Sequence, residues 1–532
     1  MENKNIIIGV VVIVLVVALG YMAFDTETTE EIPEDRELVV GTTDTATTLD
    51  PANAYDYFSS AILYNSVDTL MGYEPGTDEL ETKIATDYSI EEGGEVYNFE
   101  LREDVVFHNG EQMTAEDVKF SLERARDLEG MPSSLVADIE EVEVIDDYEL
   151  NIHLENPSIP FLSKLAYTVA GILPEGEYPY PENGEEVEDA EKFRNETLVA
   201  SGPYEVVDWQ PGELVVFEEN EDYWGDQPEA ERVEVKIYDS SEELQNAVEE
   251  DDIDLAYRSF QPSQIEQLDA NEEIESKTFE SPEIRYMVFD AAEGPYEDVN
   301  ARRGFAYAID REEINQEVYL GERHPLYSMV PSGMWSHTPV FEEEYGVGQD
   351  LESAREQLQE AGYSEEEPLE TTLWYTPSHY GDLEVDLANK IAEQLEATDM
   401  VEVTVESEVW EDFTGRMGTD FDLHLLGWYP DFYDPDNYIA PFLQSEASGF
   451  IGSHYNDSEM DQMIGEQRQI IDMDERTEKL IDIQRKLGDE APYVPLVQVE
   501  QYAAFQPEID RESVTLGPVQ IFRYYTIRKD GW

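Results

Sequence analysis

The stretch GWYPDFYDPDNY, residues 427–438, is the most unusual in the chain and gives the first indication of its fold. It follows an apolar run, 421–426, that is typical of a buried strand, whereas its own prolines and aspartates are typical of turns. We therefore expect a loop at the end of a strand, which is where ligands commonly bind in α/β proteins.

This loop combines aromatic rings with carboxylates, and three interpretations follow. Aromatic walls around one fixed carboxylate would suit an organic ligand that carries an ammonium group, through ion pairing and stacking. The loop could equally be a packed aromatic turn whose aspartates cap the backbone. A calcium site of Asp431, Asp434 and Asp436 is the third, although no glycine-hinged ligand loop accompanies these residues.

Regular elements surround this loop on both sides. Alternating runs that predict strands lie at 142–144, 148–154, 233–237 and 401–405. Helical patterns cover 114–127, 351–361, 383–395 and 457–488, and the last of these could be one helix or two. Strands and helices are mixed throughout, so the predicted class is α/β or α+β, with two to four structural units in a chain of this length.

Composition restricts the possible partners. The 532 residues include 125 Asp and Glu against 31 Lys and Arg, which gives a formal net charge of −94. Phosphates would be repelled, so nucleic acid is excluded as a partner, and the charge argues against docking on anionic lipid through a polybasic face. A hydrophobic share of 41% still allows a buried core. We interpret the excess of acidic residues on the surface as adaptation to concentrated salt.

Cysteine is absent from the sequence, which excludes disulfides and thiolate chemistry.

The chain begins with an uncharged apolar run at 6–24, preceded by Lys4. Such a segment predicts a transmembrane anchor in residues 1–24, with a cleaved signal segment as the alternative. Residues 25–36 would then be an acidic tether. In either case we expect the remainder outside the cell, by the positive-inside tendency.

Catalytic signatures are missing from the sequence. It has no G-x-S-x-G elbow, no phosphate-binding G-x-x-x-x-G-K loop and no H-E-x-x-H pair. Close carboxylate pairs occur everywhere by chance in so acidic a chain, so they say little about glycosidase chemistry. We therefore expect that the protein is not an enzyme and that it binds no cofactor and no metal. A secreted hydrolase is the alternative.

Several ordered segments resemble a known family. They are YNFELR (97–102), VFHNG (106–110), TAEDV (114–118), GPY (202–204), NEDYW (220–224), NARRGFAYAIDR (300–311), AGY (361–363), the 427–438 loop and APYVP (491–495). In this order they resemble the family 5 extracellular solute-binding proteins of ABC importers, the dipeptide, oligopeptide and nickel group. The resemblance covers about residues 37–532.

The resemblance implies a bilobal, class II periplasmic-binding-protein-like fold with an extra N-terminal domain. Lobe 1 would combine 37–60, 200–278 and 495–532, the additional domain would be 61–199, and lobe 2 would be 279–494. A ligand is expected between lobes that close by hinge motion. A membrane permease driven by a cytoplasmic ATPase would then receive the ligand from a monomeric receptor.

The resemblance also implies site residues. In peptide-binding relatives an Asp at the position of Asp431 anchors the peptide α-ammonium, and we expect a ligand-binding set of Asp431, Trp428, Tyr429, Gly427, Trp410, Arg285 and Tyr286. Some relatives hold the peptide carboxylate with an Arg just before Gly-Trp, where this chain has His424-Leu425-Leu426. Arg285 and Arg258 could substitute, or could be surface counter-ions. Peptides are the expected ligands, and oligosaccharides or other organic solutes are the alternative.

Overall fold

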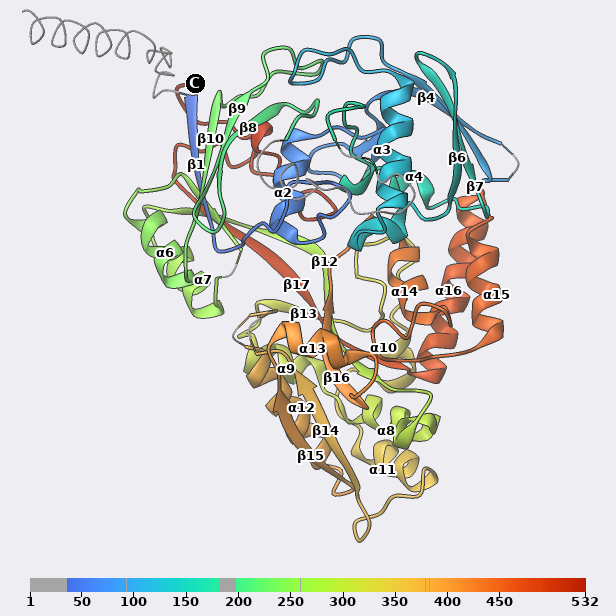
Figure 1. Cartoon of the computed structure of the whole chain (residues 1–532). Helices are drawn as coiled ribbons and strands as arrows, with labels where there is room; N and C mark the ends of the chain where they lie inside the picture. The colour runs from blue at the N-terminus through green and yellow to red at the C-terminus, as the bar shows by residue number, and fades with distance from the viewer. Residues whose placement is uncertain are drawn as a thin grey trace, which may run out of the picture.

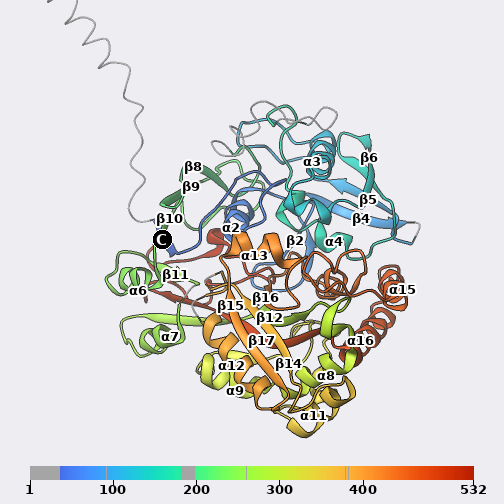
Figure 2. The same ribbon diagram turned by 60° about the horizontal axis from the view of Figure 1, so that its bottom comes forward.

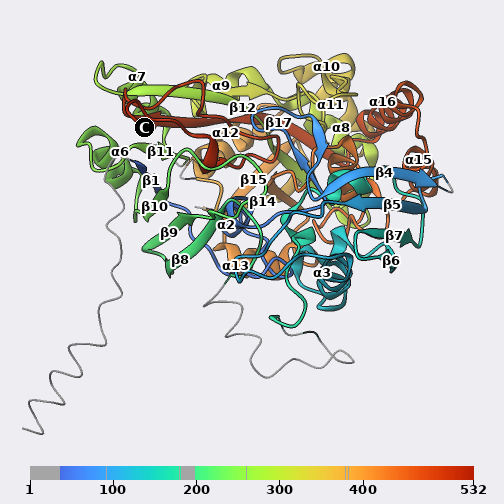
Figure 3. The same cartoon turned by 90° about the horizontal axis from the view of Figure 1, so that it is seen from above.

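Two long antiparallel strands, β12 (Glu275–Phe289) and β17 (Tyr493–Phe505), run through the middle of the molecule and join its two halves (Figure 1). The computed structural model describes residues 36–532 except 92, 179, 181–197, 259, 378 and 382. At about 3.3 Å per residue, β12 alone extends for about 50 Å, long enough to belong to both halves. Figure 3 shows the two strands side by side.

One continuous sheet passes through both halves. Within the described residues its order is β15-β14-β16-β12-β17-β11-β1-β10-β9-β8, and β13 pairs with β17 off this path. The bounds are β15 (Val401–Ser407), β14 (Leu369–Tyr375), β16 (Leu423–Trp428), β11 (Leu255–Tyr257), β1 (Glu37–Thr42), β10 (Arg232–Ile237), β9 (Leu214–Glu219), β8 (Tyr204–Gln210) and β13 (Arg323–Pro325). Parallel pairs such as β1 with β10 and β14 with β15 lie beside antiparallel ones, so the fold is mixed α/β.

The first half, at the top of Figure 1, contains strands β1 and β8–β11 and a second sheet of order β4-β5-β7-β6. The remaining bounds are β2 (Met71–Tyr73), β3 (Leu80–Thr82), β4 (Ala85–Glu91), β5 (Val96–Leu101), β6 (Ile139–Asp146), β7 (Glu149–Leu154), α2 (Tyr57–Ser66), α3 (Ala115–Asp127), α4 (Phe161–Lys164), α6 (Ser241–Glu249) and α7 (Pro262–Asp269). Both sheets contribute to one large cluster of buried apolar side chains. A small separate cluster lies under α6 and α7.

The second half has its own large core. Its helices are α8 (Val299–Ala308), α9 (Arg311–Val318), α10 (Val340–Tyr345), α11 (Leu351–Glu360), α12 (Glu384–Glu396), α13 (Trp410–Met417), α14 (Ala440–Leu443), α15 (Ser458–Gln467) and α16 (Met473–Glu490). Figure 2 shows α15 and α16 lying beside the second sheet of the first half. The backbone N–H of Ile159 donates to the carbonyl of Arg468 at 2.9 Å, which joins the halves there.

Local patterns in the sequence agree with these elements. Thr114 forms a capping box with Asp117 at the start of α3. The segment 457–488 is two helices, α15 and α16. Strand β16 extends two residues beyond the predicted 421–426 run, to Trp428, because its far end pairs with β12.

A β-bulge interrupts β12 where it leaves the first half. The register against β17 shifts between Glu280 and Ile284. Pro282 lies inside this interval and has no N–H to donate, so the ladder cannot continue through it. Its carbonyl accepts a hydrogen bond from the hydroxyl of Tyr438 at 2.6 Å. The residues of β12 that follow this bulge lie at the junction between the two cores.

The predicted domain boundaries stay a prediction. Residues 1–24 and nearly all of the predicted tether lie outside the described residues. In the part of the chain that the structure describes, no helix has both the length and the apolar character needed to cross a membrane.

Candidate functional site

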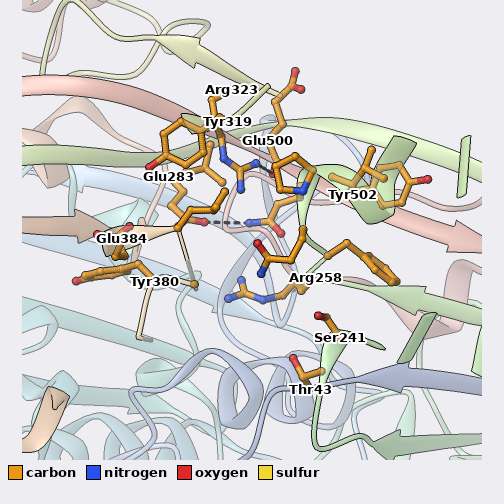
Figure 4. A pocket seen from close by; sticks show the side chains of 18 of the residues that line it. Thr43, Ser241, Arg258, Glu283, Tyr319, Arg323, Tyr380, Glu384, Glu500 and Tyr502 are labelled. Carbon is orange, nitrogen blue, oxygen red and sulfur yellow. Dashed lines mark hydrogen bonds between the residues drawn. The ribbon is translucent and has the colours of Figure 1, made fainter. Parts of the chain in front are cut away.

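A cavity of about 560 Å³ lies at the junction of the two halves, within the size range of small-molecule sites. Its wall includes Thr43, Asp44 and Arg258 from the first half, Tyr319, Arg323, Tyr380, Glu384 and Tyr429 from the second, and Glu283, Arg285, Gln501 and Tyr502 from the two crossing strands (Figure 4). Because β12 and β17 supply its floor, any movement of one half against the other changes the shape of this cavity.

Strand β12 directs Glu283 and Arg285 into the cavity. Alternate residues of a strand face the same side, so these two share a face, while Ile284 and Tyr286 point into the second core. A guanidinium Nη1 of Arg285 lies 2.6 Å from Oε1 of Glu283, and its Nε lies 3.3 Å from Oε1 of Glu384. All three side chains are almost completely buried, at 2–6% exposed. One cation is thus held between two carboxylates.

Gly427 allows this arrangement. It is the register partner of Arg285 on β16, and a Cβ there would lie closer to the Nη1 of Arg285 than van der Waals contact allows. Without a side chain, the neighbouring strand leaves room for the guanidinium to lie across it. The hydroxyl of Tyr380 donates to the Gly427 carbonyl at 3.2 Å, and the Tyr380 ring faces the guanidinium at 4.3 Å.

Arg258 is a second cavity guanidinium with a fixed position. It follows β11 with a φ of 66°. This left-handed conformation costs a non-glycine residue about 1–2 kcal/mol. Its Nε forms an ion pair with Asp44 at 2.8 Å. The guanidinium lies over the Tyr57 ring at 3.8 Å and near Tyr429, to whose hydroxyl it donates at 3.4 Å. This cation is therefore neutralised and stacked.

Arg323 is the third cavity guanidinium and has a different environment. Its Nη1 donates to the backbone carbonyls of Glu500, at 3.1 Å, and Glu322, at 3.4 Å. Among the described residues it forms no ion pair with a carboxylate. Burial lowers the pKa of Arg323, although the nearby Tyr319 and Glu283 act to raise it.

Asp431 lies outside the residues that line this cavity. It is 9% exposed, and its Oδ2 accepts hydrogen bonds from the Tyr55 hydroxyl at 3.2 Å and the Asn437 amide at 3.3 Å. No cation of the described chain forms an ion pair with it. Burial raises the pKa of Asp431 to about 6, although both hydrogen bonds and the more distant Lys164 act to lower it.

The loop that carries Asp431 also bridges the two halves. Phe432 is buried in the core of the first half, and its neighbour Tyr433 packs against both cores. The backbone N–H of Tyr433 donates to the hydroxyl of Tyr73 at 3.0 Å. Together with the Tyr55 contact, these interactions bring the two halves together around Asp431.

The remaining aspartates of this loop have arginine partners. Asp434 forms a two-pronged pair with Arg476 at 2.6 and 2.7 Å, and Asp436 forms one with Arg468 at 2.8 and 2.9 Å. Across the described residues, no group of three or more carboxylate or imidazole side chains could hold a metal ion. The calcium interpretation of this loop is therefore wrong: Asp434 and Asp436 instead attach the loop to Arg476 of α16 and to Arg468 at the end of α15.

The other predicted residues occupy varied positions. Tyr429 lines the cavity, whereas Trp428 donates from Nε1 to Asn437 at 3.1 Å, beside Asp431. Trp410 stacks on His379, with ring centroids 3.7 Å apart, and so stands behind a residue that lines the cavity. Tyr286 does not reach the cavity, because strand alternation turns it into the second core against Phe442 and Tyr493.

Several cavity residues were missed from the sequence, among them Asp44, Glu283, Arg323, Tyr380 and Glu384. The i, i+2 spacing of Glu283 and Arg285 was a usable signal, because both must face one side of a strand. Glu384 had no comparable signal, since it is one of 125 acidic residues and reaches Arg285 from a helix 99 positions away.

Known proteins match this chain along most of its length. A probable D,D-dipeptide-binding periplasmic protein of Escherichia coli is 24% identical over 94% of this chain and 95% of its own. Two solved structures share the fold with a TM-score of 0.79 and 23% identity over 93% of this chain. One is a periplasmic binding protein of Helicobacter pylori in complex with the peptide STSA, and the match covers 98% of that chain. The other is a dipeptide-binding protein of a Pseudoalteromonas species in complex with Met-Leu, and the match covers 100% of that chain.

A sequence model of one family decides the assignment. The sequence model described as "Bacterial extracellular solute-binding proteins, family 5 Middle" matches residues 79–450 of this chain. This match covers more than half of the chain. Members of this family bind solutes for transport, in agreement with a cavity set between two cores. The chain therefore belongs to the bacterial extracellular solute-binding proteins of family 5.

Proposed function

We propose that this protein is the substrate-binding receptor of an ABC importer and that it captures peptides, from dipeptides to oligopeptides, between its two halves. The observation that carries the proposal is Asp431, a buried carboxylate between the halves that has no ion-pair partner among the described residues. The names of the D,D-dipeptide-binding and dipeptide-binding relatives support the same ligand class.

A buried carboxylate without a counter-ion is unfavourable, so the site favours a ligand that supplies one. A peptide ammonium would do so, with Trp428 and Tyr429 of the same loop beside it. The remainder of the peptide would extend into the cavity along β12 and β17. These two strands are the connection about which the halves would close, as hinged binding proteins do.

Titration calorimetry tests the proposal. Short peptides with a free N-terminus, added to the purified protein in molar KCl, should bind, and the same peptides with an acetylated N-terminus should bind at least about tenfold more weakly. The acetylated peptide is the matched control, because it keeps every side chain and replaces the ammonium by a neutral but larger amide. Equal affinity for the two would contradict the ammonium site, and no binding of any peptide would contradict the ligand class.

Oligosaccharides are the second candidate. The cavity wall includes Tyr319, Tyr380, Tyr429 and Tyr502, and aromatic faces can stack on sugar rings. A thermal shift with oligosaccharides, but not with peptides, would favour this candidate.

Further parts of the proposal come from the sequence. The receptor would work outside the cell as a monomer, held by its N-terminal segment or released after cleavage, and would deliver its ligand to permease subunits and through them to an ATPase. We propose that it catalyses no reaction. Its charge of −94 suits concentrated salt, where screening weakens the repulsion among surface carboxylates.

A further inference from the structure

The three guanidinium groups of the cavity differ in how far the protein itself neutralises them. Arg285 has two carboxylate partners and Arg258 has one, Asp44, while Arg323 donates to backbone carbonyls, lies over the Tyr319 ring and has no ion-pair partner among the described residues. A ligand carboxylate would therefore meet a different local charge at each of the three. Arg285 thus has two carboxylates within ion-pair distance, whereas no carboxylate of the described residues comes within that distance of Arg323.

The surroundings of Arg285 are the most unusual part of this wall. Glu283 is fixed on both oxygens, since Oε1 pairs with Arg285 and Oε2 accepts from the Gln501 amide at 3.0 Å. Glu384 approaches from the first turn of α12, and both carboxylates line the cavity. A ligand carboxylate placed beside Arg285 would lie close to two carboxylates that already pair with this guanidinium, in a buried site where solvent screening is weak.

We infer that Glu384, together with Glu283, is a specificity determinant that keeps ligand carboxylates away from Arg285, so that the cavity accepts peptides whose side chains at that place are neutral or cationic. The inference rests on the proposed function, because it names the class of peptide that the same site takes. The carboxyl terminus of the peptide remains free to use Arg323, whose guanidinium has no carboxylate partner within the described chain.

Glu384→Gln isolates the charge from the shape. Glutamine keeps an oxygen that can accept from Nε of Arg285, and Glu283 remains as a counter-ion, so the fold should be retained. Asp386→Asn is the matched control, because Asp386 lies in the same first turn of α12, is exposed and does not line the cavity. Both variants remove one negative charge from the same helix end.

The probes are alanine tripeptides in which one residue is Gln or Glu, compared as pairs at each of the three positions. Each pair has the same termini and nearly the same shape. In the unaltered protein, at least one position should prefer Gln to Glu by about tenfold or more, which corresponds to about 1.4 kcal/mol. In Glu384→Gln that preference should fall to within about threefold or reverse, and in Asp386→Asn it should be unchanged.

The outcomes separate this inference from the proposed function. If the tripeptides bind but Gln and Glu are equivalent at every position, or if Glu384→Gln keeps the full preference, the inference is overturned and peptide capture stands. If the folded protein binds none of the tripeptides, peptide capture itself fails and the inference fails with it. Glu283→Gln gives a second, independent variant, and it should weaken the preference in the same direction.

Discussion

Replacement of Asp431 by asparagine should make the ligand-free protein more stable and its binding of free peptides weaker. The two effects have opposite signs because they arise from one buried charge. Asparagine keeps the size of the side chain, and its Oδ1 can accept the hydrogen bonds from Tyr55 and Asn437 that Asp431 accepts now. The negative charge is lost, and an NH₂ group takes the place of the second carboxylate oxygen.

The size of the stability effect follows from the pKa of the carboxyl group. Burial raises the pKa of Asp431 to about 6 in the folded protein, against about 3.9 in an unfolded chain. The folded state therefore binds the proton more tightly, and ionisation opposes folding above the unfolded pKa. Two pKa units correspond to about 3 kcal/mol, which is reached in full above about pH 7 and is reduced to about half at pH 5.

Chemical denaturation of the unaltered protein and Asp431→Asn, in molar KCl at pH 8 and pH 5, measures this effect. The variant should gain about 3 kcal/mol in free energy of unfolding at pH 8 and about half of that at pH 5. Asp226→Asn is the control, since Asp226 is exposed and forms no hydrogen bond or ion pair within the described chain; its stability should barely change. An Asp431→Asn protein that is no more stable at pH 8, or gains equally at both pH values, would refute the reasoning.

Binding should change in the other direction. A hydrogen bond to a charged group contributes about 1.5–3 kcal/mol, so a peptide with a free ammonium should bind Asp431→Asn about 10- to 100-fold more weakly at pH 8. The acetylated peptide should lose much less. Unchanged affinity for the free peptide, measured by titration calorimetry, would show that Asp431 does not receive the ammonium.

Four further predictions concern pH, the loop, the strand contact and salt. Affinity for a free-ammonium peptide should fall as the pH drops below about 6, because the Asp431 carboxyl becomes protonated, and calorimetry at pH 5 and 8 should find no such fall in the asparagine variant. Arg476→Ala leaves the carboxylate of Asp434 buried and unpaired, so denaturation should reveal a loss of about 3–5 kcal/mol; a loss below about 1 kcal/mol would contradict the pair's importance. Gly427→Ala puts a Cβ against the guanidinium of Arg285 and should destabilise the protein by about 1–3 kcal/mol in the same denaturation assay, whereas unchanged stability would show that the arginine moves aside. Transfer from molar to millimolar salt should lower the melting temperature, because −94 charges are no longer screened, and a constant melting temperature would argue against adaptation to salt.

Local structure was the most predictable part of this protein. The capping box at Thr114 and the two-stranded pattern at 142–154 involve residues that are close in sequence, so their side chains alone select the conformation. The strand before Gly427 was also predicted, but it begins two residues later and ends two residues later than expected, where its far end pairs with β12. The loop's aspartates were less predictable, since the arginine partners of Asp436 and Asp434 lie 32 and 42 positions further along the chain.

By itself the sequence determined the family, the mixed α/β class, the acidic surface and the loop that carries Asp431, because each depends on composition or on short ordered patterns. Tertiary structure alone decided which of the 125 acidic residues meet the cavity arginines, and that Tyr286 faces the core while Arg285 faces the cavity. The physical reason is that ion pairs between distant segments depend on strand register and on the packing of helices against the sheet. In a chain with so many carboxylates, sequence spacing cannot distinguish the few that become buried beside a guanidinium from the many that remain in water.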